Sequence, residues 1–159
     1  MNINIVCIGK LKEKYWSDAI SEYSKRLGRY CTLQIKELKE DRLHDNASAA
    51  EEQAVKVNEG KSILKAISDN SYVIALDVKG KQLSSEQLAD KIEGLAVDGR
   101  SNIDLIIGGS LGLSEEVLKR ADFRLSFSPM TFPHQMMRVI LLEQIYRSFK
   151  IIKNETYHK

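Results

Sequence analysis

A glycine-rich segment near residue 110 contains a serine in a pattern that certain hydrolases use for catalysis. Gly108-Gly109-Ser110-Leu111-Gly112 follows an apolar run and matches G-x-S-x-G, where an exposed serine acts as nucleophile. Asp122 and His134 follow in the chain order of a hydrolase triad, although Asp122 lies only twelve residues beyond the serine. A serine hydrolase is therefore one hypothesis. The alternatives are a glycine turn that lets backbone approach a ligand, and a purely structural turn.

An arginine falls on the apolar face of the last predicted helix. At about 100° per residue, His134, Arg138, Leu141 and Ile145 share one side of this helix. A buried arginine needs a carboxylate, a phosphate or backbone carbonyls as partners. A surface arginine would instead lay its aliphatic stem on the core.

The last three residues are an aromatic ring, an imidazole and a cation: Tyr157, His158 and Lys159. Terminal segments usually fray, which makes disorder the simplest interpretation. Aromatic and basic side chains together also suit stacking on a nucleobase and contact with its phosphate.

These residues belong to a chain with ordinary globular composition. It has 159 residues, 43% of them hydrophobic and 29% charged, which predicts a single domain over residues 1–159. No apolar run is long enough to span a membrane, and the first residues do not resemble a signal peptide, so we expect a cytoplasmic protein. The two cysteines are expected to be reduced thiols. The scattered cysteines and three histidines predict no metal site.

Charge is distributed unevenly along the chain. The first 30 residues hold six Lys or Arg against three Asp or Glu, and residues 134–159 hold five against two. Residues 31–133 hold 13 against 17. If the two ends meet in space, they form a basic surface that attracts phosphates; the alternative is ordinary solvated helix faces.

Strand and helix patterns alternate, which predicts an α/β fold with a largely parallel sheet. The expected strands are 3–8, 32–38, 72–76, 103–107 and 123–127. The expected helices are about 13–30, one that Ser48 opens and that includes Ile67, one that Ser84 opens and that includes Leu88, Ile92 and Leu95, about 114–121 and about 134–152. Ser48 with Glu51 and Ser84 with Gln87 have the spacing of capping boxes. On the helix after Ser48 we expect Ala50, Ala54, Val57, Leu64 and Ile67 to share one face, and we expect 77–82 to be a turn.

Ligands in such folds bind at the carboxyl ends of strands. Three loops there are unusual: those after Leu76, after Ile107 and after Phe127. The last helix is apolar nearly all round at Val139–Leu142, which predicts packing on two sides, either in a subunit interface or within the core of one chain.

Several of these segments together resemble one family. They are Gly9–Trp16, Glu22–Leu27, Ile107–Gly112, Ser126–Arg138 with the run Thr-Phe-Pro-His-Gln-Met-Met-Arg, and the Tyr-His-Lys ending. This set is similar to the RlmH family, SPOUT-class methyltransferases of large-subunit ribosomal RNA. The resemblance spans the whole chain.

The resemblance implies a parallel-sheet SPOUT methyltransferase fold with a C-terminal trefoil knot, S-adenosylmethionine as methyl donor, and N3 of a pseudouridine as acceptor. It also implies a homodimer through the C-terminal helix and a substrate that is the large-subunit RNA, expected on the assembled ribosome. Position by position it places the cofactor at Leu76, Gly108 and the run 127–132. The complete set expected to bind the cofactor is Leu76, Gly108, Gly109, Phe127, Ser128, Pro129, Met130, Thr131 and Phe132.

Methylation of a ring nitrogen requires removal of its proton, for which a base with a pKa near the operating pH is suited. His158 is the first candidate and His134 the second, and Tyr157 and Arg138 complete the expected catalytic set. The basic residues expected to contact RNA are Lys159, Arg147, Lys10 and Lys12. For the dimer interface we expect Val139–Leu142 and Ile145, with Met136. The alternatives to a methyltransferase are the serine hydrolase and a non-catalytic RNA- or ribosome-binding module that uses the basic ends.

Overall fold

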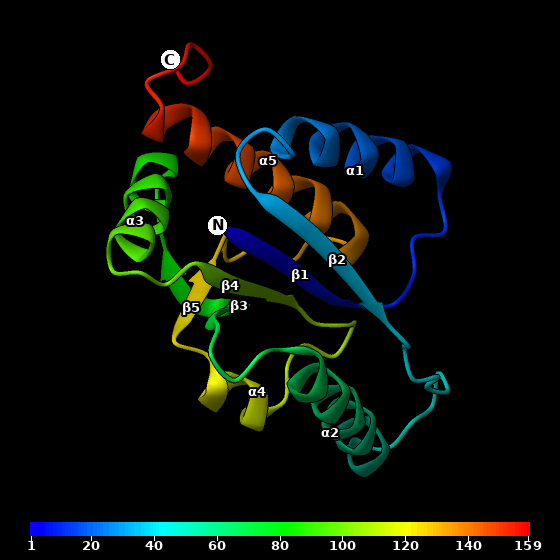
Figure 1. The fold of residues 1–159 in the computed structure, drawn as a ribbon. Helices are drawn as coiled ribbons and strands as arrows, with labels where there is room; N and C mark the ends of the chain where they lie inside the picture. Colours follow the sequence, from blue (N-terminus) through cyan, green and yellow to red (C-terminus); the bar gives the residue numbers. More distant parts are fainter.

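The computed structural model describes residues 1–159 and alternates five strands with five helices (Figure 1). The elements are β1 (Asn2–Ile8), α1 (Lys14–Leu27), β2 (Thr32–Leu38), α2 (Ala49–Ala66), β3 (Tyr72–Gln82), α3 (Ser85–Val97), β4 (Asn102–Ile107), α4 (Glu115–Arg120), β5 (Phe123–Ser126) and α5 (His134–Ile152). The predicted α/β class and the order of elements are confirmed.

The five strands form one sheet in the order β2-β1-β4-β3-β5, and every pair is parallel. Ile5 of β1 pairs with Ile35 on one side and with Leu105 of β4 on the other. Because all strands run the same way, their carboxyl ends reach the same edge of the sheet. Of the three loops singled out from the sequence, two follow β4 and β5, and the third, after Leu76, lies within β3; these three strands are neighbours.

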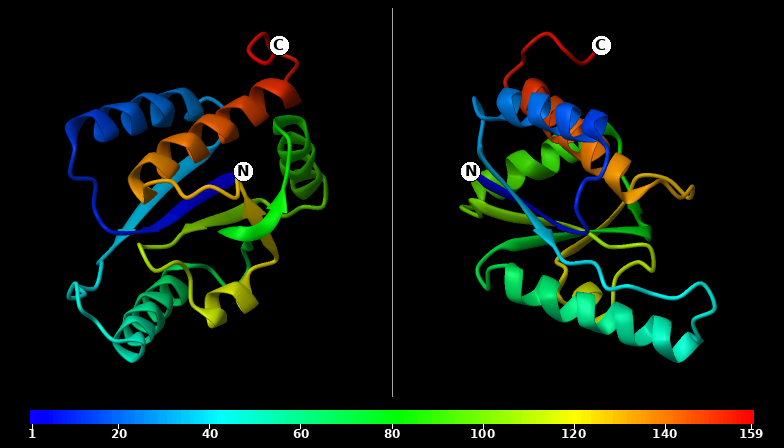
Figure 2. Two further views of the ribbon diagram at one scale, coloured as in Figure 1. Left: turned by 180° about the vertical axis from the view of Figure 1, so that it is seen from behind. Right: turned by 90° about the vertical axis from the view of Figure 1, so that its right-hand side faces the viewer.

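Helices cover both faces of the sheet (Figures 1 and 2). On one face α1, α3 and α5 pack over the larger apolar cluster, which includes Ile5, Leu105 and Leu142. On the other face α2 and α4 pack over a smaller cluster with Val6, Ile63 and Val117. Burial on two faces explains the continuous apolar runs of β1 and β4.

Both predicted capping boxes are present. The Ser48 side chain accepts from the Glu51 amide while the Glu51 carboxylate accepts from the Ser48 amide, and Ser84 and Gln87 do the same for α3. The two helices therefore begin where the sequence predicts, since their first amides are satisfied locally.

Strand β3 corrects one expectation, because residues 77–82 continue the strand rather than form a turn. Pairing with β5 shifts at an irregularity between Leu76 and Lys81, after which Lys81 pairs with Leu125 and Gln82 with Ser126. A Cβ on Gly80 would lie 2.6 Å from the carbonyl oxygen of Arg124, so glycine permits this close approach.

The buried face of α2 agrees with the expected one only in part: Val57 is half-buried, and Leu64 and Ile67 pack against the smaller apolar cluster. Ala50 and Ala54 are exposed, whereas Glu59, Gly60 and Ile63 are buried. A side chain at position 60 would overlap the hydroxyl of Ser114, the N-cap of α4. Close contact between α2 and α4, rather than apolar periodicity, selects the buried face.

Candidate functional site

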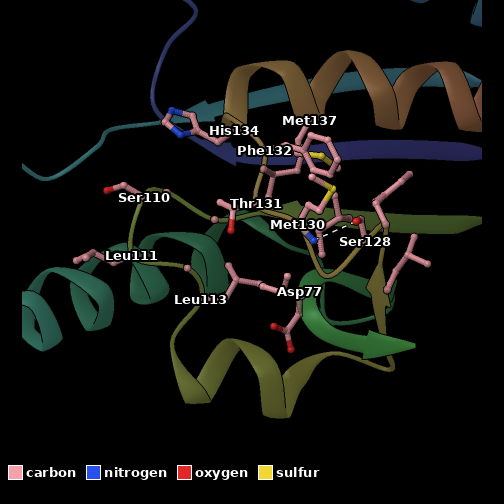
Figure 3. Close-up of a pocket in the computed structure, with 18 residues that line it drawn as sticks. Asp77, Ser110, Leu111, Leu113, Ser128, Met130, Thr131, Phe132, His134 and Met137 are labelled. Carbon is pink, nitrogen blue, oxygen red and sulfur yellow. Dashed lines mark hydrogen bonds between the residues drawn. The ribbon is translucent and has the colours of Figure 1, made fainter. Parts of the chain in front are cut away.

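One pocket lies where the middle of β3 meets the loops after β4 and β5 (Figure 3). Its volume is about 340 Å³, within the range of about 300–1,000 Å³ typical of small-molecule sites. The lining residues are Leu76, Asp77, Val78, Ile107, Gly108, Gly109, Ser110, Leu111, Gly112, Leu113, Leu125, Phe127, Ser128, Met130, Thr131, Phe132, His134 and Met137.

Local hydrogen bonds shape two of these loops. The Gly109 carbonyl accepts from the Gly112 amide at 3.1 Å, and Gly112 has a φ of +82°, which closes a tight turn after β4. After β5, the Ser128 hydroxyl accepts from the Met130 amide at 3.0 Å. The chain thus turns sharply twice and presents backbone toward the pocket.

The first two glycines of the β4 loop are required by the chain's own atoms. A Cβ on Gly108 would lie 3.0 Å from the backbone carbon and oxygen of Gly112 and from a methyl group of Leu113. A Cβ on Gly109 would lie 3.0 Å from Oε2 of Glu59, a buried carboxyl on α2. We expected these glycines to make room for a ligand, but the loop's own packing already leaves no space for side chains there.

The pocket gathers eight of the nine residues predicted to bind the cofactor. They are Leu76, Gly108, Gly109, Phe127, Ser128, Met130, Thr131 and Phe132. Pro129 is exposed and does not line the pocket. Sequence analysis placed the segment after Leu76 at this end of the sheet but did not name Asp77 and Val78 as site residues.

The chemistry of the lining suits a largely apolar ligand with polar edges. Ten of the 18 lining residues are hydrophobic, and the titratable side chains among them are Asp77 and His134. Asp77 is already engaged, since it forms an ion pair with Arg124 and accepts from the Lys79 amide. Apolar side chains there can pack against a planar ring, and loop backbone can form hydrogen bonds with a polar edge of the same ligand.

His134 stands at the start of α5, on the side of the pocket nearest β1 (Figure 3). Its Nε2 lies 3.8 Å from the position that a Cβ on Gly9 would take, and a Glu40 carboxylate oxygen lies 3.3 Å from that position. The absence of a side chain at Gly9 allows both groups to approach the end of β1. Of the two imidazoles predicted as bases, His134 is therefore at the pocket.

Arg138 is buried, with 1% of its surface exposed, and does not line the pocket. It donates to Glu37 Oε2 at 2.8 Å and to the carbonyls of Ile8 and Gly9 at 2.9 and 2.7 Å. The sequence-based inference that a buried arginine needs a carboxylate or backbone carbonyls is confirmed. Every hydrogen-bond partner of Arg138 belongs to the protein, and Arg138 is not among the residues that line the pocket, so its membership of the catalytic set stays a prediction.

The tail folds back on its own chain, away from the pocket lining. The Tyr157 hydroxyl donates to Glu143 at 3.1 Å, and the Arg147 guanidinium lies 4.7 Å from the centre of the Tyr157 ring. His158 has Nε2 2.6 Å from Glu86 and Nδ1 3.3 Å from Arg147. Within one chain the tail is thus ordered by polar contacts rather than frayed, and it does not bring His158 to His134.

Two of these partners have shifted acid–base properties. The pKa of Glu86 is lowered to about 2 by hydrogen bonds that its carboxylate accepts from the Ser84 side chain, from the Glu86 backbone amide and from His158. Hydrogen bonding to Glu143 raises the pKa of Arg147. Both groups therefore stay charged around His158 at neutral pH.

The residues predicted to contact RNA differ in availability. Lys10, Lys12 and Lys159 are exposed. Arg147 is paired with Glu143 at 2.7 Å. The two basic ends of the chain meet in space through α1 and α5, which pack side by side (Figures 1 and 2).

The hydrolase interpretation of Ser110 finds no support in the geometry. No hydrogen bond joins Ser110, His134 and Asp122; instead Asp122 accepts from the Val73 amide at 2.8 Å and pairs with Arg120. Ser110 also lacks the strained backbone of a nucleophile elbow, because the one non-glycine residue with positive φ is Asn154. Ser110 is an exposed residue of the pocket rim.

The residues predicted for a dimer interface separate into two groups. Leu141, Leu142 and Ile145 are fully buried in the core of one chain, so their assignment to an interface is wrong. Met136, Val139 and Ile140 are half-buried on α5. Packing inside one chain therefore accounts for much of the apolar stretch 139–142.

Apart from the pocket, the features that bear on other classes of site are the cysteines, possible metal ligands and possible membrane-spanning helices. Both cysteines are free, and burial raises the pKa of the Cys7 and Cys31 thiols to about 11. No group of three or more His, Cys, Asp or Glu side chains is arranged to hold a metal ion. No helix has the length and apolar character needed to cross a bilayer.

Comparison with known proteins adds three findings. The family model described as "Predicted SPOUT methyltransferase" matches residues 1–158. Proteins named "Ribosomal RNA large subunit methyltransferase H" from Alkaliphilus oremlandii and Clostridium novyi are 64% and 62% identical over 159 residues, covering 100% of both chains in each case. A solved structure titled as a probable methylase family protein from Haemophilus influenzae Rd KW20 has a TM-score of 0.53 at 16% identity, over 99% of this chain and 70% of the other; this likeness concerns the fold.

Proposed function

Since this chain belongs to the SPOUT methyltransferase family, and specifically to the ribosomal RNA large subunit methyltransferase H group, we propose that it transfers a methyl group from S-adenosylmethionine to N3 of a pseudouridine in large-subunit ribosomal RNA. Methylation of large-subunit RNA follows from its relatives, which match it over its full length. The methyl donor, the acceptor atom and the use of the assembled ribosome are the parts that we propose. A cytoplasmic location, with the ribosomes, is part of the same proposal.

The convergence of three separate segments on one pocket carries this proposal. They begin at Leu76, Ile107 and Phe127, which are 31 and 20 residues apart in turn along the chain, and they meet because β4, β3 and β5 are parallel neighbours. A pocket with apolar walls and two backbone-lined turns can take an adenosine group. S-adenosylmethionine, when bound, supplies a methyl group already activated on a sulfonium.

The chain's own residues then have three tasks. Leu76, Phe127 and Phe132 form apolar walls and fix the position of the donor, which sets the distance and angle at the acceptor nitrogen. The loop 108–112 closes the opposite side of the pocket. A base at the rim accepts the N3 proton, and His134 is the imidazole placed there within one chain.

His158 acts in this proposal only from a second copy of the chain. Its contacts with Glu86 and Arg147 hold it outside the pocket lining of its own chain. A homodimer through α5 would carry each tail toward the partner's pocket and bring Tyr157 and His158 to the acceptor. The trefoil knot expected for the C-terminal part of the chain remains a prediction within this proposal.

Two measurements test the proposed function. Titration calorimetry with S-adenosylmethionine should give saturable binding that is lost when the 108–112 loop is disrupted. Mass spectrometry of ribosomal RNA from cells lacking the protein should show one pseudouridine without its methyl group, and the purified protein should restore it on isolated large subunits or ribosomes. Binding of no S-adenosylmethionine, or an unchanged set of modified nucleosides in the deletion strain, would contradict the proposal.

A further inference from the structure

The loop between β1 and α1 is held in place by an unusual buried group. Arg138 has 1% of its surface exposed. It donates hydrogen bonds to the carbonyl of Ile8, the last residue of β1, and to the carbonyl of Gly9, which follows it. Its third partner is Glu37 Oε2 on β2, at 2.8 Å. The same carboxylate oxygen accepts from the Leu11 amide at 3.0 Å.

Two more features fix the loop's conformation. Gln135 of α5 accepts from the Lys12 amide at 3.1 Å, so the loop is attached to α5 at a second point. Gly9 has a φ of +85°, which turns the chain sharply at the end of β1. Residues 9–12 are therefore held by side chains from β2 and α5, which are distant in the sequence.

Burying Arg138 in this way costs folding free energy, so a contribution to stability does not by itself explain the residue. The Nε of Arg138 is buried without a hydrogen-bond partner, and an unpaired buried donor costs free energy. Buried ion pairs can often be replaced by apolar residues without loss of stability. A buried arginine in an otherwise apolar part of α5 therefore suggests a task beyond packing.

The loop presents two free cations beside the pocket. Lys10 and Lys12 are exposed, and neither takes part in an ion pair, in contrast to Lys14, which pairs with Asp18 at 2.6 Å. Gly9, the first residue of this loop, lies against His134, which lines the pocket (Figure 3 labels His134), so the loop that carries the two lysines adjoins the pocket on its His134 side.

We propose that Arg138 and Glu37 form a bracket that presents the Gly9–Lys12 loop as a preformed site for RNA phosphates beside the pocket. Arg138 and Glu37 are then positioning residues: they act on RNA binding through Lys10 and Lys12 and touch neither the donor nor the reacting atoms. This inference rests on the proposed function and adds to it the surface that receives the RNA backbone.

Removal of Glu37 tests the bracket, because geometry and charge predict opposite results. Glu37→Ala deletes a negative charge near the two lysines, which by electrostatics alone would strengthen binding of RNA. The bracket predicts weaker binding, since Leu11 and Arg138 lose their shared acceptor. Glu40→Ala is the matched control: it removes the same charge from the same end of β2, from a carboxylate that accepts no hydrogen bond from the loop or Arg138. Glu37 is about one-third exposed, so its replacement spares the core more than replacement of Arg138 would.

The readout is methyl transfer to large ribosomal subunits or ribosomes as substrate concentration and salt are varied. For Glu37→Ala we expect a KM for the ribosomal particle raised about tenfold, which is the effect of about 1.4 kcal/mol, with kcat and the affinity for S-adenosylmethionine nearly unchanged. The double variant Lys10→Ala/Lys12→Ala should likewise raise KM for the ribosomal particle and leave kcat and the affinity for S-adenosylmethionine nearly unchanged. Each lost phosphate contact should flatten the dependence of log KM on log salt by about 0.7–0.9. Glu37→Gln, which keeps an acceptor, should recover part of the loss.

A double-mutant cycle separates positioning from a general structural effect. If Glu37 acts through the lysines, adding Glu37→Ala to Lys10→Ala/Lys12→Ala changes KM little further. Additive effects, a KM for Glu37→Ala equal to or below that of Glu40→Ala, or a loss of S-adenosylmethionine affinity would each overturn the bracket. A wild-type protein that methylates no large-subunit RNA would instead overturn the proposed function, and it is measured first.

Discussion

At the residue scale, the loop 108–112 after β4 leaves little space for a side chain at Gly108. A Cβ on Gly108 already meets backbone of Gly112 and a Leu113 methyl group at 3.0 Å, and valine adds two more carbons. Gly108→Val should displace the loop and abolish S-adenosylmethionine binding in calorimetry, while the protein stays folded with a melting temperature lowered by a few degrees. Overpacking of this kind costs about 1–3 kcal/mol.

Two controls belong to this prediction. Gly94→Ala, on α3 with no atom within 4 Å of the new Cβ, should bind the donor normally. Ser110→Ala, in the same loop, should leave methyl transfer largely intact. Normal donor affinity in Gly108→Val would remove this loop from the site, and loss of activity in Ser110→Ala would revive the hydrolase hypothesis.

Glu59 makes a separate residue-scale prediction about pH. Burial raises its pKa, with the Asp41 amide opposing that effect, so the native state holds its proton to a higher pH than the unfolded chain does. Such a carboxyl lowers the free energy of unfolding as pH rises through its native pKa. Glu59→Gln should therefore raise the melting temperature at pH 7–8, and the gain over wild type should shrink toward pH 4. Thermal unfolding by circular dichroism across this range checks it; a Gln variant less stable at every pH would show that the carboxylate is needed.

At the element scale, the tail after α5 is ordered on its own chain but is proposed to work on the partner. Deletion of Tyr157–Lys159 should leave S-adenosylmethionine affinity nearly unchanged and reduce methyl transfer by orders of magnitude, measured in single-turnover assays. General-base catalysis contributes about 10²–10⁴-fold, so whichever of His134→Ala and His158→Ala removes the base should fall in that range. A tail deletion with wild-type rates would exclude the tail from the acceptor site.

The helices and strands differ in how well the sequence predicts their bounds and their buried faces. The bounds of β2 and α5 and the starts of α2 and α3 follow from apolar period and capping residues, because those signals lie within the elements themselves. The extension of β3 and the buried face of α2 depend on Gly80 and Gly60, whose importance lies in their contacts with Arg124 and Ser114. Such contacts join distant segments, so local patterns could not reveal them.

The site shows the same division. The loops after β4 and β5 were predictable because glycines and a proline follow their apolar runs, whereas the loop expected after Leu76 is strand. The partners of Arg138 were predictable only as a chemical class, since Ile8, Gly9 and Glu37 are about 100 or more residues away in the sequence. Asp77 and Val78 escaped because their strand continues beyond the apolar run.

At the scale of the whole molecule, a dimer through α5 would use its half-buried side chains. Ile140 is the test position, because its neighbours Leu141 and Leu142 serve the core of one chain. Ile140→Asp would bury two unpaired charges across a two-fold interface. For Ile140→Asp we expect monomers in light scattering and loss of methyl transfer. Binding of S-adenosylmethionine is measured on the same samples. A wild-type protein that is monomeric and fully active at the assay concentration would contradict the dimer.

Mixed dimers decide whether the tail works across the interface. One subunit lacks Tyr157–Lys159 and the other carries Gly108→Val. If the tail serves the partner's pocket, one site has both defects and the other has none, so about half the activity survives. If the tail serves its own pocket, each site has one defect and the mixed dimer should be inactive.

The strand order has a consequence for how the protein is made. β1 is an interior strand, and its pairing with β4 joins Asn2 to Asn102 and Cys7 to Ile107, so one edge of β1 stays open until about two-thirds of the chain has been synthesised. The pocket needs β5 and α5, which emerge later still. Sheets built from such distant pairs fold slowly. The nascent chain thus spends most of its synthesis with an exposed apolar strand edge, and it can acquire its structure only near release from the machine that makes it.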